Sequence, residues 1–304
     1  MHNFEAQVRK VMVNLQIAFS DRLLADGNFY FYPRKPKVSD IELLAISIVA
    51  ESLSIHSENA LFTRFSKEFP GLVGRISRPR FNIRRRALNI HMEDFFERCH
   101  NRLLNEGNAF VVDSTPLPVC KLGRLSRLRS CKDNPNIPPQ YGYCHAKKEG
   151  YYGFKMHLIT TQKSAVPVAF SITSAKVHDI RALEDLLDEK PELNGAQLLG
   201  DKGYVSSPLQ LHLFESKAID LKAKPRINMK TPLNWTPEMA AIRRTIETVF
   251  SQIHDQFRLG QNFARTFDGL VTRVTHKLAG LLSCQLINIQ NGRSPNLIKS
   301  ALFI

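Results

Sequence analysis

Apolar and polar positions over the first hundred residues recur with a helical period, and no strand-like alternation of any length interrupts them. Ser39 and Glu42 have the spacing of a capping box, which marks the start of a helix. The apolar positions after this start form one helix face: Ile41, Leu44, Ala45 and Ile48. A second helical pattern covers residues 82–104. We therefore predict an all-helical region over residues 1–105.

An arginine cluster lies between these two helical patterns. Its members are Arg75, Arg78, Arg80, Arg84, Arg85 and Arg86. Pro79 breaks the run, and Phe81 opens a helical stretch after it. A turn followed by a basic helix is typical of helix-turn-helix proteins, whose recognition helix enters the major groove of DNA. The alternative is an exposed basic face without a groove partner, so we predict DNA contact here and leave the motif open.

The pattern changes at Ala109, where short apolar runs replace the helical period. Strands are expected over residues 109–113, 151–160, 166–173, 196–200 and 218–223. Helices are expected over residues 180–187, 208–216 and 236–258. Thr236 and Pro237 mark the last helix start, as its cap and its first helical residue. This order predicts an α/β domain over residues 106–262, a mixed sheet flanked by helices, followed by a C-terminal helical segment over 263–304.

A basic, proline-rich segment lies inside this domain, over residues 116–149. Prolines at several positions argue against regular core structure, so we expect a loop. Its arginines are candidates for DNA contact: Arg124, Arg127 and Arg129.

Two aspartates follow apolar strands of the predicted sheet. Asp113 ends the first strand, and Asp201 directly follows the strand that ends at Gly200. In open α/β sheets, ligands bind beyond the carboxyl ends of the strands. If the two strands are neighbours, both carboxylates project into one crevice.

Glu247 lies on the last predicted helix of this domain. The apolar stripe of that helix consists of Ile242, Ile246, Val249 and Ile253. Glu247 flanks this stripe, and Arg243 and Arg244 lie one turn before it on the same side of the helix. The glutamate can therefore lie at the edge of the core and face the same crevice as the two aspartates.

Three carboxylates in one crevice suit hard divalent cations such as Mg²⁺, which prefer oxygen ligands. Two such ions held about 4 Å apart can activate a nucleophile and stabilise the leaving oxygen in a phosphoryl displacement. The alternative is that these acids are solvated surface residues or caps, because acids at strand ends and helix starts often are.

The charge balance favours a polyanionic partner. The 304 residues contain 42 Lys and Arg against 28 Asp and Glu, which gives a formal net charge of +14 and a pI near 9.7. Nucleic acid is the commonest partner of so basic a chain, although a basic surface without a special partner is the alternative.

Neither a disulfide framework nor a membrane span is expected. The five cysteines are odd in number, and Cys120, Cys131, Cys144 and His145 lack the close Cys pair of a zinc site. The most apolar stretch, residues 270–289, contains Arg273 and Lys277 and is typical of an amphipathic helix. The start of the chain has no signal-peptide core. We expect a protein of the cytoplasm that associates with the nucleoid.

At this point the sequence resembles bacterial insertion-sequence transposases of the DDE type, and within them the insertion-sequence nine-eight-two group. Four blocks carry the resemblance: Val112-Asp113-Ser114-Thr115-Pro116, Tyr151-Tyr152-Gly153-Phe154-Lys155, Gly200-Asp201-Lys202-Gly203-Tyr204, and the arginine-rich helix that contains Glu247. Val177-His178-Asp179, before a helix, also resembles the segment that the family has between its two aspartate blocks. By itself, His178-Asp179 is typical of a turn and helix start.

The resemblance implies a ribonuclease H-like core, two Mg²⁺ or Mn²⁺ ions, strand cleavage at the ends of the element and transfer of the 3′-OH to target DNA. Asp113, Asp201 and Glu247 match the three metal-binding acids of the family. Further positions match residues that contact DNA or support the triad: Lys155, Lys202, Tyr204 and Arg243. Arg244, beside Arg243, is a further candidate for DNA contact. The implied partners are the terminal inverted repeats and the target, both double-stranded DNA, with a homodimer or larger assembly in the synaptic complex.

The glutamate motif is a variant of the pattern in the wider superfamily. That pattern has a Tyr seven residues before the Glu, an Arg four before and a Lys seven after. Here these positions hold Ala240, Arg243 and His254, so only the arginine matches. Two other hypotheses remain at this point: a ribonuclease H-fold nuclease that does not join strands, and a DNA-binding protein whose acids are structural.

Overall fold

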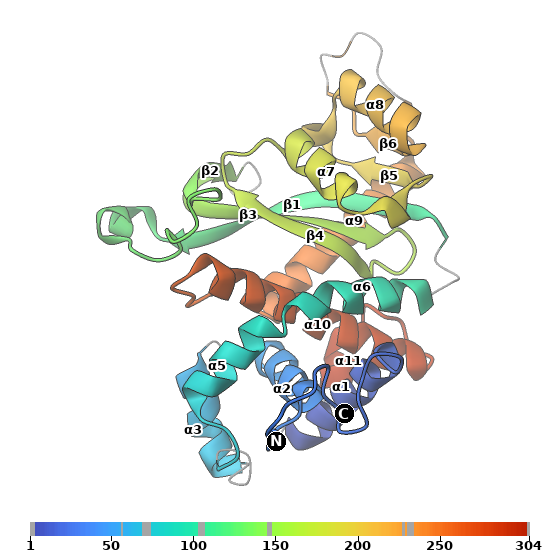
Figure 1. Cartoon of the computed structure of the whole chain (residues 1–304). Helices are drawn as coiled ribbons and strands as arrows, with labels where there is room; N and C mark the ends of the chain where they lie inside the picture. Colours follow the sequence, from blue (N-terminus) through green and yellow to red (C-terminus); the bar gives the residue numbers. More distant parts are fainter. Residues whose placement is uncertain are drawn as a thin grey trace. The chain divides into compact units, whose positions relative to one another are not determined.

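A computed structural model describes residues 4–55, 57–68, 74–102, 107–144, 148–226, 229 and 234–302 of the chain (Figure 1). The chain forms two compact units. One consists of Met1–Cys99 with Ile253–Ile304, and the other is His100–Gln252. His145 and residues 103–106, where the first predicted domain boundary falls, lie outside the described residues.

The first unit is built from helices. They are α1 (Phe4–Ala18), α2 (Asp40–Ser52), α3 (Glu58–Glu68), α5 (Arg78–Ala87), α6 (Ile90–Arg102), α10 (Phe267–Gln290) and α11 (Ile298–Leu302). The Ser39 hydroxyl accepts a hydrogen bond from the Glu42 N–H at 3.2 Å, which confirms the predicted start of α2. The single helical pattern predicted over 82–104 is two helices, because the chain turns at Leu88 and Asn89 between α5 and α6.

Helices α2 and α10 pack together, so segments from the two ends of the chain share one core. The helix predicted over 270–289 is α10. Its Arg273 and Lys277 are buried, at 4% and 0% side-chain exposure. They lie around Glu51 of α2, so tertiary ion pairing compensates their burial.

Glu51 is the centre of this buried ionic cluster. Its carboxylate lies 2.9 Å from the ammonium of Lys277, 3.0 Å from the guanidinium of Arg273 and 3.7 Å from that of Arg85 on α5. Burial by itself raises the pKa of Glu51, but the three cations outweigh it and hold the pKa below its usual value. The cluster ties α2, α5 and α10 together, and removal of one buried partner leaves charge without compensation.

The second unit contains a six-stranded mixed sheet. Its strands are β1 (Ala109–Cys120), β2 (Gln140–Cys144), β3 (Glu149–Thr161), β4 (Pro167–Ser174), β5 (Gln197–Gly200) and β6 (Asp220–Ala223). The order is β2-β3-β1-β5-β6, and β4 also pairs with β3. Strands β1 to β4 pair antiparallel, whereas β5 runs parallel to both β1 and β6. The predicted α/β class, a mixed sheet with helices, is therefore confirmed.

Helices α7 (Asp179–Asp188) and α8 (Ser207–Lys217) cover one face of this sheet, and α9 (Pro237–Asp255) leads out of the unit. Leu183 and Leu186 on the apolar side of α7 belong to the same buried core cluster as Val112 of β1 and Leu221 of β6. Each such leucine contributes about 1.5–3 kcal/mol through the apolar surface that it removes from water.

Strand β1 extends seven residues beyond the predicted strand end, into the segment expected to be a loop. Pro116 and Pro118 lie in this extension and pair with β3. The parallel partner β5 pairs with β1 only as far as Val112. Beyond Val112, β1 has β3 as its sole strand partner among the described residues, so the two prolines lie at a sheet edge, where a missing N–H is tolerated.

Among the described residues, no helix combines the length and the apolarity that a membrane crossing requires. The five cysteines are free thiols in this structure: Cys99, Cys120, Cys131, Cys144 and Cys284.

Candidate active site

Asp113 lies in the interior of β1, where the sequence pattern placed a strand end. Val112 packs into the core beneath α7, so its neighbour Asp113 points to the opposite face of the sheet. Val112 pairs with Gly200, the last residue of β5. Asp113 and Asp201 are therefore the first residues beyond the paired segment of two adjacent parallel strands, as the crevice argument requires.

The Asp113 carboxylate is largely enclosed and has a high pKa. Burial, and then the negative charge of Asp201, raise the pKa of Asp113 to about 7. The Ser114 N–H, which donates to Asp113 Oδ1 at 2.8 Å, and the Arg243 guanidinium, 3.5 Å from Oδ2, oppose this rise. Two carboxylates lie close together here with little water around them. The nearby positive charge does not compensate the ionised form of both.

A short turn fixes Asp201. It caps the 3-10 turn Lys202–Tyr204, and its Oδ1 accepts the Gly203 N–H at 2.6 Å. A Cβ at position 203 would lie 2.8 Å from this oxygen, closer than side chains tolerate. Glycine at 203 is therefore required for the turn that holds the carboxylate.

Glu247 on α9 is linked to Asp113 by Arg243, which contacts both side chains. The Arg243 guanidinium forms a short ion pair with Glu247 Oε1, one helical turn away, and also contacts Asp113. The Glu247 side chain is half exposed, whereas that of Arg243 is mostly buried. The structure thus brings Asp113 and Asp201 together. The guanidinium of Arg243 lies between Asp113 and Glu247 and contacts both.

The donor set at Asp113 and Asp201 fits a hard divalent cation. Carboxylate oxygens are the ligands that Mg²⁺ and Mn²⁺ prefer, and a cation would offset both the burial of Asp113 and the nearby charge of Asp201, which raise its pKa. In the part of the chain that the structure describes, no three His, Cys, Asp or Glu residues converge closely enough to hold a metal ion. Arg243, in contact with both Asp113 and Glu247, provides the countercharge there instead.

Asp179 is a fourth acid at this site, in a dipeptide with His178 for which the sequence favoured a turn and helix start over a catalytic base pair. It is the first residue of α7, with His178 as the cap, which confirms the predicted turn and helix start. Its Oδ1 lies 2.6 Å from the Lys155 ammonium. The resemblance of Val177-His178-Asp179 to a family segment was the one signal that could have indicated it.

A family model supplies the decisive comparison. The model described as "Transposase DDE domain" matches residues 105–282, which is more than half of the chain. This chain belongs to the DDE transposase-domain family. The matched range includes Asp113, Asp201 and Glu247.

A solved transposase shares the fold. The chain is similar to the piggyBac transposase in a cryo-EM structure of its synaptic complex with hairpin DNA, with a TM-score of 0.51 and 10% sequence identity. The match covers 98% of this chain and 77% of the piggyBac chain. At this identity the likeness shows the fold alone, and it agrees with the mixed α/β architecture of this family member.

The arginines predicted to contact DNA in the helical unit of this transposase-family chain differ in availability. Arg80 and Arg86 are exposed on α5, whereas Arg75 pairs with Glu42 at 2.8 Å and Arg78 donates to Asn59 at 2.9 Å. The remaining two, Arg84 and Arg85, face inward.

Arg84 donates to Asp40 at 2.5 Å, and Arg85 is only 3% exposed and belongs to the Glu51 cluster. A side chain so buried cannot contact DNA, so the expectation for Arg85 is corrected to a structural role.

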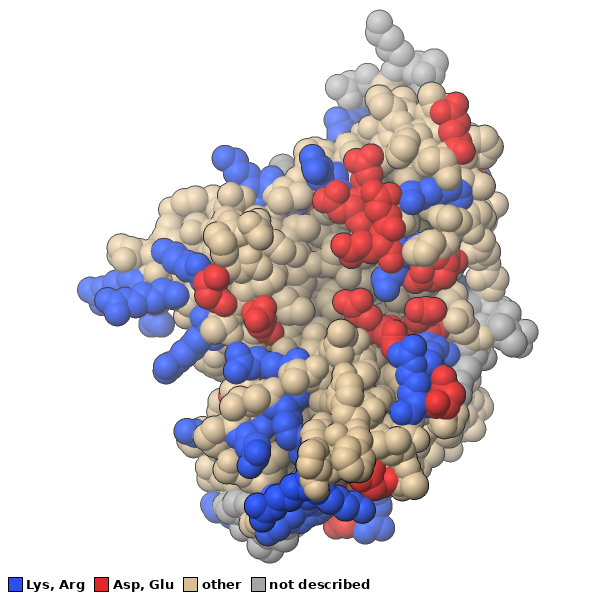
Figure 2. Space-filling model, in the orientation of Figure 1, with Lys and Arg blue, Asp and Glu red and all other residues tan. Residues whose placement is uncertain are grey.

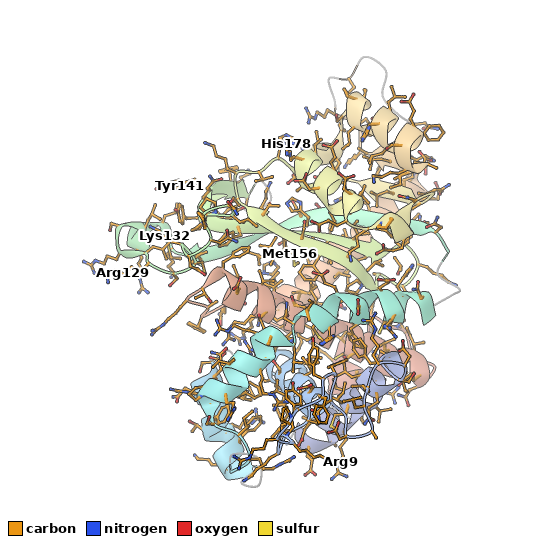
Figure 3. All side chains as sticks on the ribbon, viewed as in Figure 1. Arg9, Arg129, Lys132, Tyr141, Met156 and His178 are labelled. Atoms are coloured by element: carbon orange, nitrogen blue, oxygen red, sulfur yellow. The ribbon has the colours of Figure 1, made fainter. Side chains whose placement is uncertain are left out.

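The β1–β2 connection carries the second group of predicted DNA-contact arginines. We call residues 121–144 the arm; it contains a 3-10 turn (Leu122–Arg127) and β2. Arg124, Arg127 and Arg129 are exposed on it, and none forms an ion pair with another residue in the described ranges. Figure 2 shows Lys and Arg side chains gathered on this projection, and Figure 3 labels Arg129, Lys132 and Tyr141 there.

The predicted contact residues within the sheet unit are also of two kinds. Lys202 and Arg244 are exposed, whereas Lys155 and Arg243 are engaged by acids of the site. Tyr204 is fully buried in the core of the unit. Burial and then the charges of Asp179, Asp113 and Asp201 raise the pKa of Tyr204. The predicted DNA contact of Tyr204 is therefore wrong. Its side chain packs in the core of the sheet unit instead.

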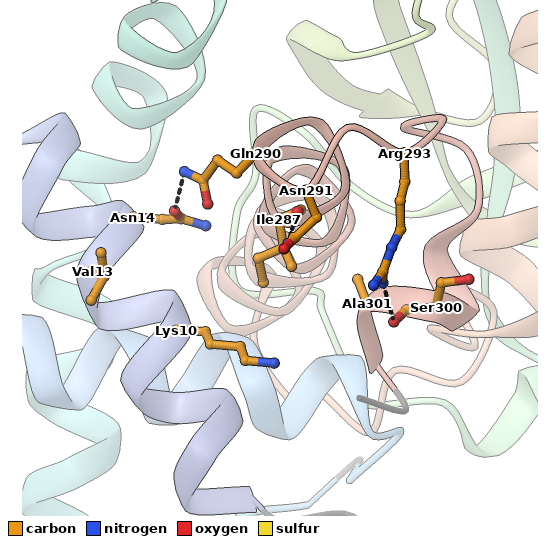
Figure 4. A pocket seen from close by; sticks show the side chains of 9 residues that line it. All are labelled: Lys10, Val13, Asn14, Ile287, Gln290, Asn291, Arg293, Ser300 and Ala301. Carbon is orange, nitrogen blue, oxygen red and sulfur yellow. Dashed lines mark hydrogen bonds between the residues drawn. The ribbon is translucent and has the colours of Figure 1, made fainter.

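The helical unit contains a pocket whose lining, in the part of the chain that the structure describes, does not include the acids discussed above. It has a volume of about 230 Å³ and lies between α1, α10 and α11 (Figure 4). Lys10 and Arg293 supply its cationic groups, and Asn14 and Gln290 on its wall are hydrogen-bonded to each other at 3.0 Å. Among the described residues that line it, none is an acid.

Proposed function

We propose that this chain is the transposase of a bacterial insertion sequence, which cleaves DNA at the ends of its element and transfers the 3′-OH to target DNA. The observation that carries the proposal is the adjacency of Asp113 and Asp201 beyond the paired segment of β1 and β5, in a chain of the DDE transposase-domain family. Glu247, joined to Asp113 through Arg243, is the third acid.

The finer fold assignment is a ribonuclease H-like core. Four strands that pair antiparallel, β1 to β4, followed by the parallel strands β5 and β6, support it, with the first acid on the central strand β1. Within the family, we propose membership of the insertion-sequence nine-eight-two group, on the strength of the Gly200-Asp201-Lys202-Gly203-Tyr204 and Tyr151-Tyr152-Gly153-Phe154-Lys155 blocks.

Asp113 and Asp201 would hold divalent Mg²⁺ or Mn²⁺, with Glu247 as the third donor. Two such ions, when bound, supply activation of the attacking oxygen and stabilisation of the leaving oxygen. The Ser114 and Gly203 N–H groups orient the two aspartates, since each donates to a carboxylate oxygen that cannot then rotate freely. Arg243 supplies positive charge between Asp113 and Glu247.

The proposed partner is double-stranded DNA, as terminal inverted repeats and as target. The exposed arginines of the arm and of α5 supply phosphate contacts, which position a duplex without reading its sequence. The piggyBac structure is of a synaptic complex with hairpin DNA, which supports a homodimer or larger assembly that joins two DNA ends. We place this activity at the nucleoid, in the cytoplasm.

The test uses the full chain and duplexes that carry the repeats flanking its gene. Wild-type protein with Mg²⁺ or Mn²⁺ should nick these ends and join a pre-cleaved end to a plasmid. Asp113→Asn, Asp201→Asn and Glu247→Gln should each lose both reactions and still bind the duplex. Full joining by any of the three would contradict the proposal. Cleavage without joining would favour a nuclease, and binding without cleavage would favour a non-catalytic DNA-binding protein.

A further inference from the structure

The carboxylate of Asp179 lies between the two chain segments that carry Asp113 and Asp201. Asp179 begins α7, so its carboxylate lies at a helix N-terminus, where a negative charge interacts favourably with the helix dipole. The side chain is 23% exposed. Each of its two oxygens faces a different neighbour.

The Oδ1 atom faces β1 and β3. It accepts from the Lys155 ammonium at 2.6 Å and from the Ser114 hydroxyl at 3.4 Å. Ser114 follows Asp113, and its own N–H donates to Asp113 Oδ1 at 2.8 Å. Ser114 thus contacts Asp179 through its side chain and Asp113 through its backbone.

The Oδ2 atom faces the turn that carries Asp201. A Cβ at Gly203 would lie 3.0 Å from Asp179 Oδ2 and 2.8 Å from Asp201 Oδ1. The two carboxylates therefore approach the same Cα, and the Gly203 N–H donates to Asp201 at 2.6 Å. A side chain at 203 would have to push the two carboxylates apart.

Lys155 supplies the positive charge that permits a third carboxylate at this place. His157 Nδ1 is 4.0 Å from Asp179 Oδ1, but burial lowers the pKa of His157 to about 4, so its ring is neutral at pH 7. The ion pair is 16% and 23% exposed for Lys155 and Asp179, so solvent screens it only in part. Lys155, expected from the resemblance to contact DNA or support the triad, here has an acid partner.

We propose that Asp179 is a positioning residue for the two catalytic aspartates, Asp113 and Asp201. It contacts Ser114 and Lys155 on one side and approaches Gly203 on the other. These contacts set the spacing of the two aspartates, and so the affinity of that pair for a divalent cation. The proposal rests on the proposed function, since it takes these two residues as metal ligands. Groups that orient metal ligands from behind typically change metal affinity about 10- to 100-fold when they are removed.

The test is Mn²⁺ binding to the full chain without DNA, measured by electron paramagnetic resonance of the free ion. Asp179→Asn keeps the shape and removes the carboxylate. Gly203→Ala changes no charge and alters the spacing only. Asp188→Asn is the matched control, because Asp188 ends the same helix and pairs with Lys217 at 3.1 Å.

Asp179→Asn and Gly203→Ala should each weaken Mn²⁺ binding about 10- to 100-fold. Asp179→Asn should keep the melting temperature of the Asp188→Asn control, which should bind as wild type does. Wild-type affinity in either variant would overturn the proposal. Complete loss in Asp179→Asn would make Asp179 a ligand and would also overturn the positioning role. If Asp179→Asn does not fold, Ser114→Ala decides instead, because it removes the hydroxyl that contacts Asp179 and keeps the N–H that donates to Asp113; wild-type Mn²⁺ affinity in that variant would overturn the proposal.

Failure of the proposed function would look different. Asp113→Asn would then bind Mn²⁺ as tightly as wild type, and the aspartate pair would not be a metal site. If Asp113→Asn abolishes binding while Asp179→Asn and Gly203→Ala leave it intact, the metal site stands and the positioning role of Asp179 fails.

Discussion

The guanidinium of Arg243 lies 3.5 Å from Asp113 Oδ2 and forms a short ion pair with Glu247, so one cation bridges two of the three acids. The position of this cation is set by helix geometry, because Arg243 and Glu247 are one turn apart on α9. Arg243 therefore competes with any divalent cation for the same carboxylates.

Replacement of Arg243 by glutamine should tighten Mn²⁺ binding. An opposite charge within 4–6 Å changes the proton affinity of a carboxylate by about 1 to 3 pKa units, so we expect an effect of about tenfold on cation affinity. Arg244→Gln is the control, because it removes the same charge from an exposed neighbour. Weaker binding in Arg243→Gln than in Arg244→Gln would show that Arg243 helps to hold the cation instead of competing with it.

Loss of the buried Glu51 carboxylate should destabilise the helical unit. Glu51→Gln leaves Arg85, Arg273 and Lys277 without their shared acid, and breaking a buried ion pair costs about 3–5 kcal/mol. Glu5→Gln breaks an exposed pair with Arg9 and should cost less than about 1 kcal/mol. Urea unfolding followed by circular dichroism measures both, and similar midpoints for the two variants would refute a stabilising cluster.

The helical unit should lose stability in mild acid through His276. Burial lowers the pKa of His276 to about 3, and its Nδ1 lies 2.8 Å from the Ser47 hydroxyl. Between pH 6.5 and about 3 the unfolded chain binds a proton at this residue that the folded chain does not, so the free energy of unfolding falls as pH falls.

His276→Gln should reduce this pH dependence. Each such histidine contributes about 1.4 kcal/mol per pH unit below pH 6.5. The unfolding free energy of His276→Gln, measured from pH 7 to pH 4, should therefore fall less steeply than that of wild type. His212→Gln, which removes an exposed histidine from α8, should retain the wild-type slope. Equal slopes for all three proteins would mean that His276 is not buried as a neutral ring.

The arm should contribute salt-dependent DNA affinity. Each phosphate contact changes the slope of log K against log salt by about 0.9 for duplex DNA, so replacement of Arg124, Arg127 and Arg129 by glutamine should flatten the slope by up to about 2.7. Fluorescence anisotropy at several salt concentrations measures this slope. Arg181→Gln, on an exposed arginine that pairs with Asp185 on α7, should change it little. An unchanged slope in the triple variant would exclude the arm from the DNA interface.

The local pattern of the sequence is sufficient to predict most elements of the sheet unit. The strand predicted over 196–200 is β5, and the helix predicted from Thr236 and Pro237 is α9. These predictions succeed because apolar periodicity and helix caps depend on neighbours in the chain. The extension of β1 through Pro116 and Pro118 was missed, because whether a proline is tolerated depends on which strands lie beside it.

Residue types and their neighbours also allowed Asp113, Asp201 and Glu247 to be named as candidates from the sequence, and a family resemblance supported them. Their relation in space was decided by tertiary structure: β5 pairs with β1 only as far as Val112, and Arg243 bridges two of the acids.

By itself, the sequence determined the elements, the basic character and the candidate acids. Tertiary structure decided that Arg85 and Tyr204 are buried and that Asp179 lies against Ser114 and Gly203, on the two segments that carry the aspartates. The physical reason is that burial and electrostatic partnership depend on residues far apart in the chain, which only the folded arrangement brings into contact.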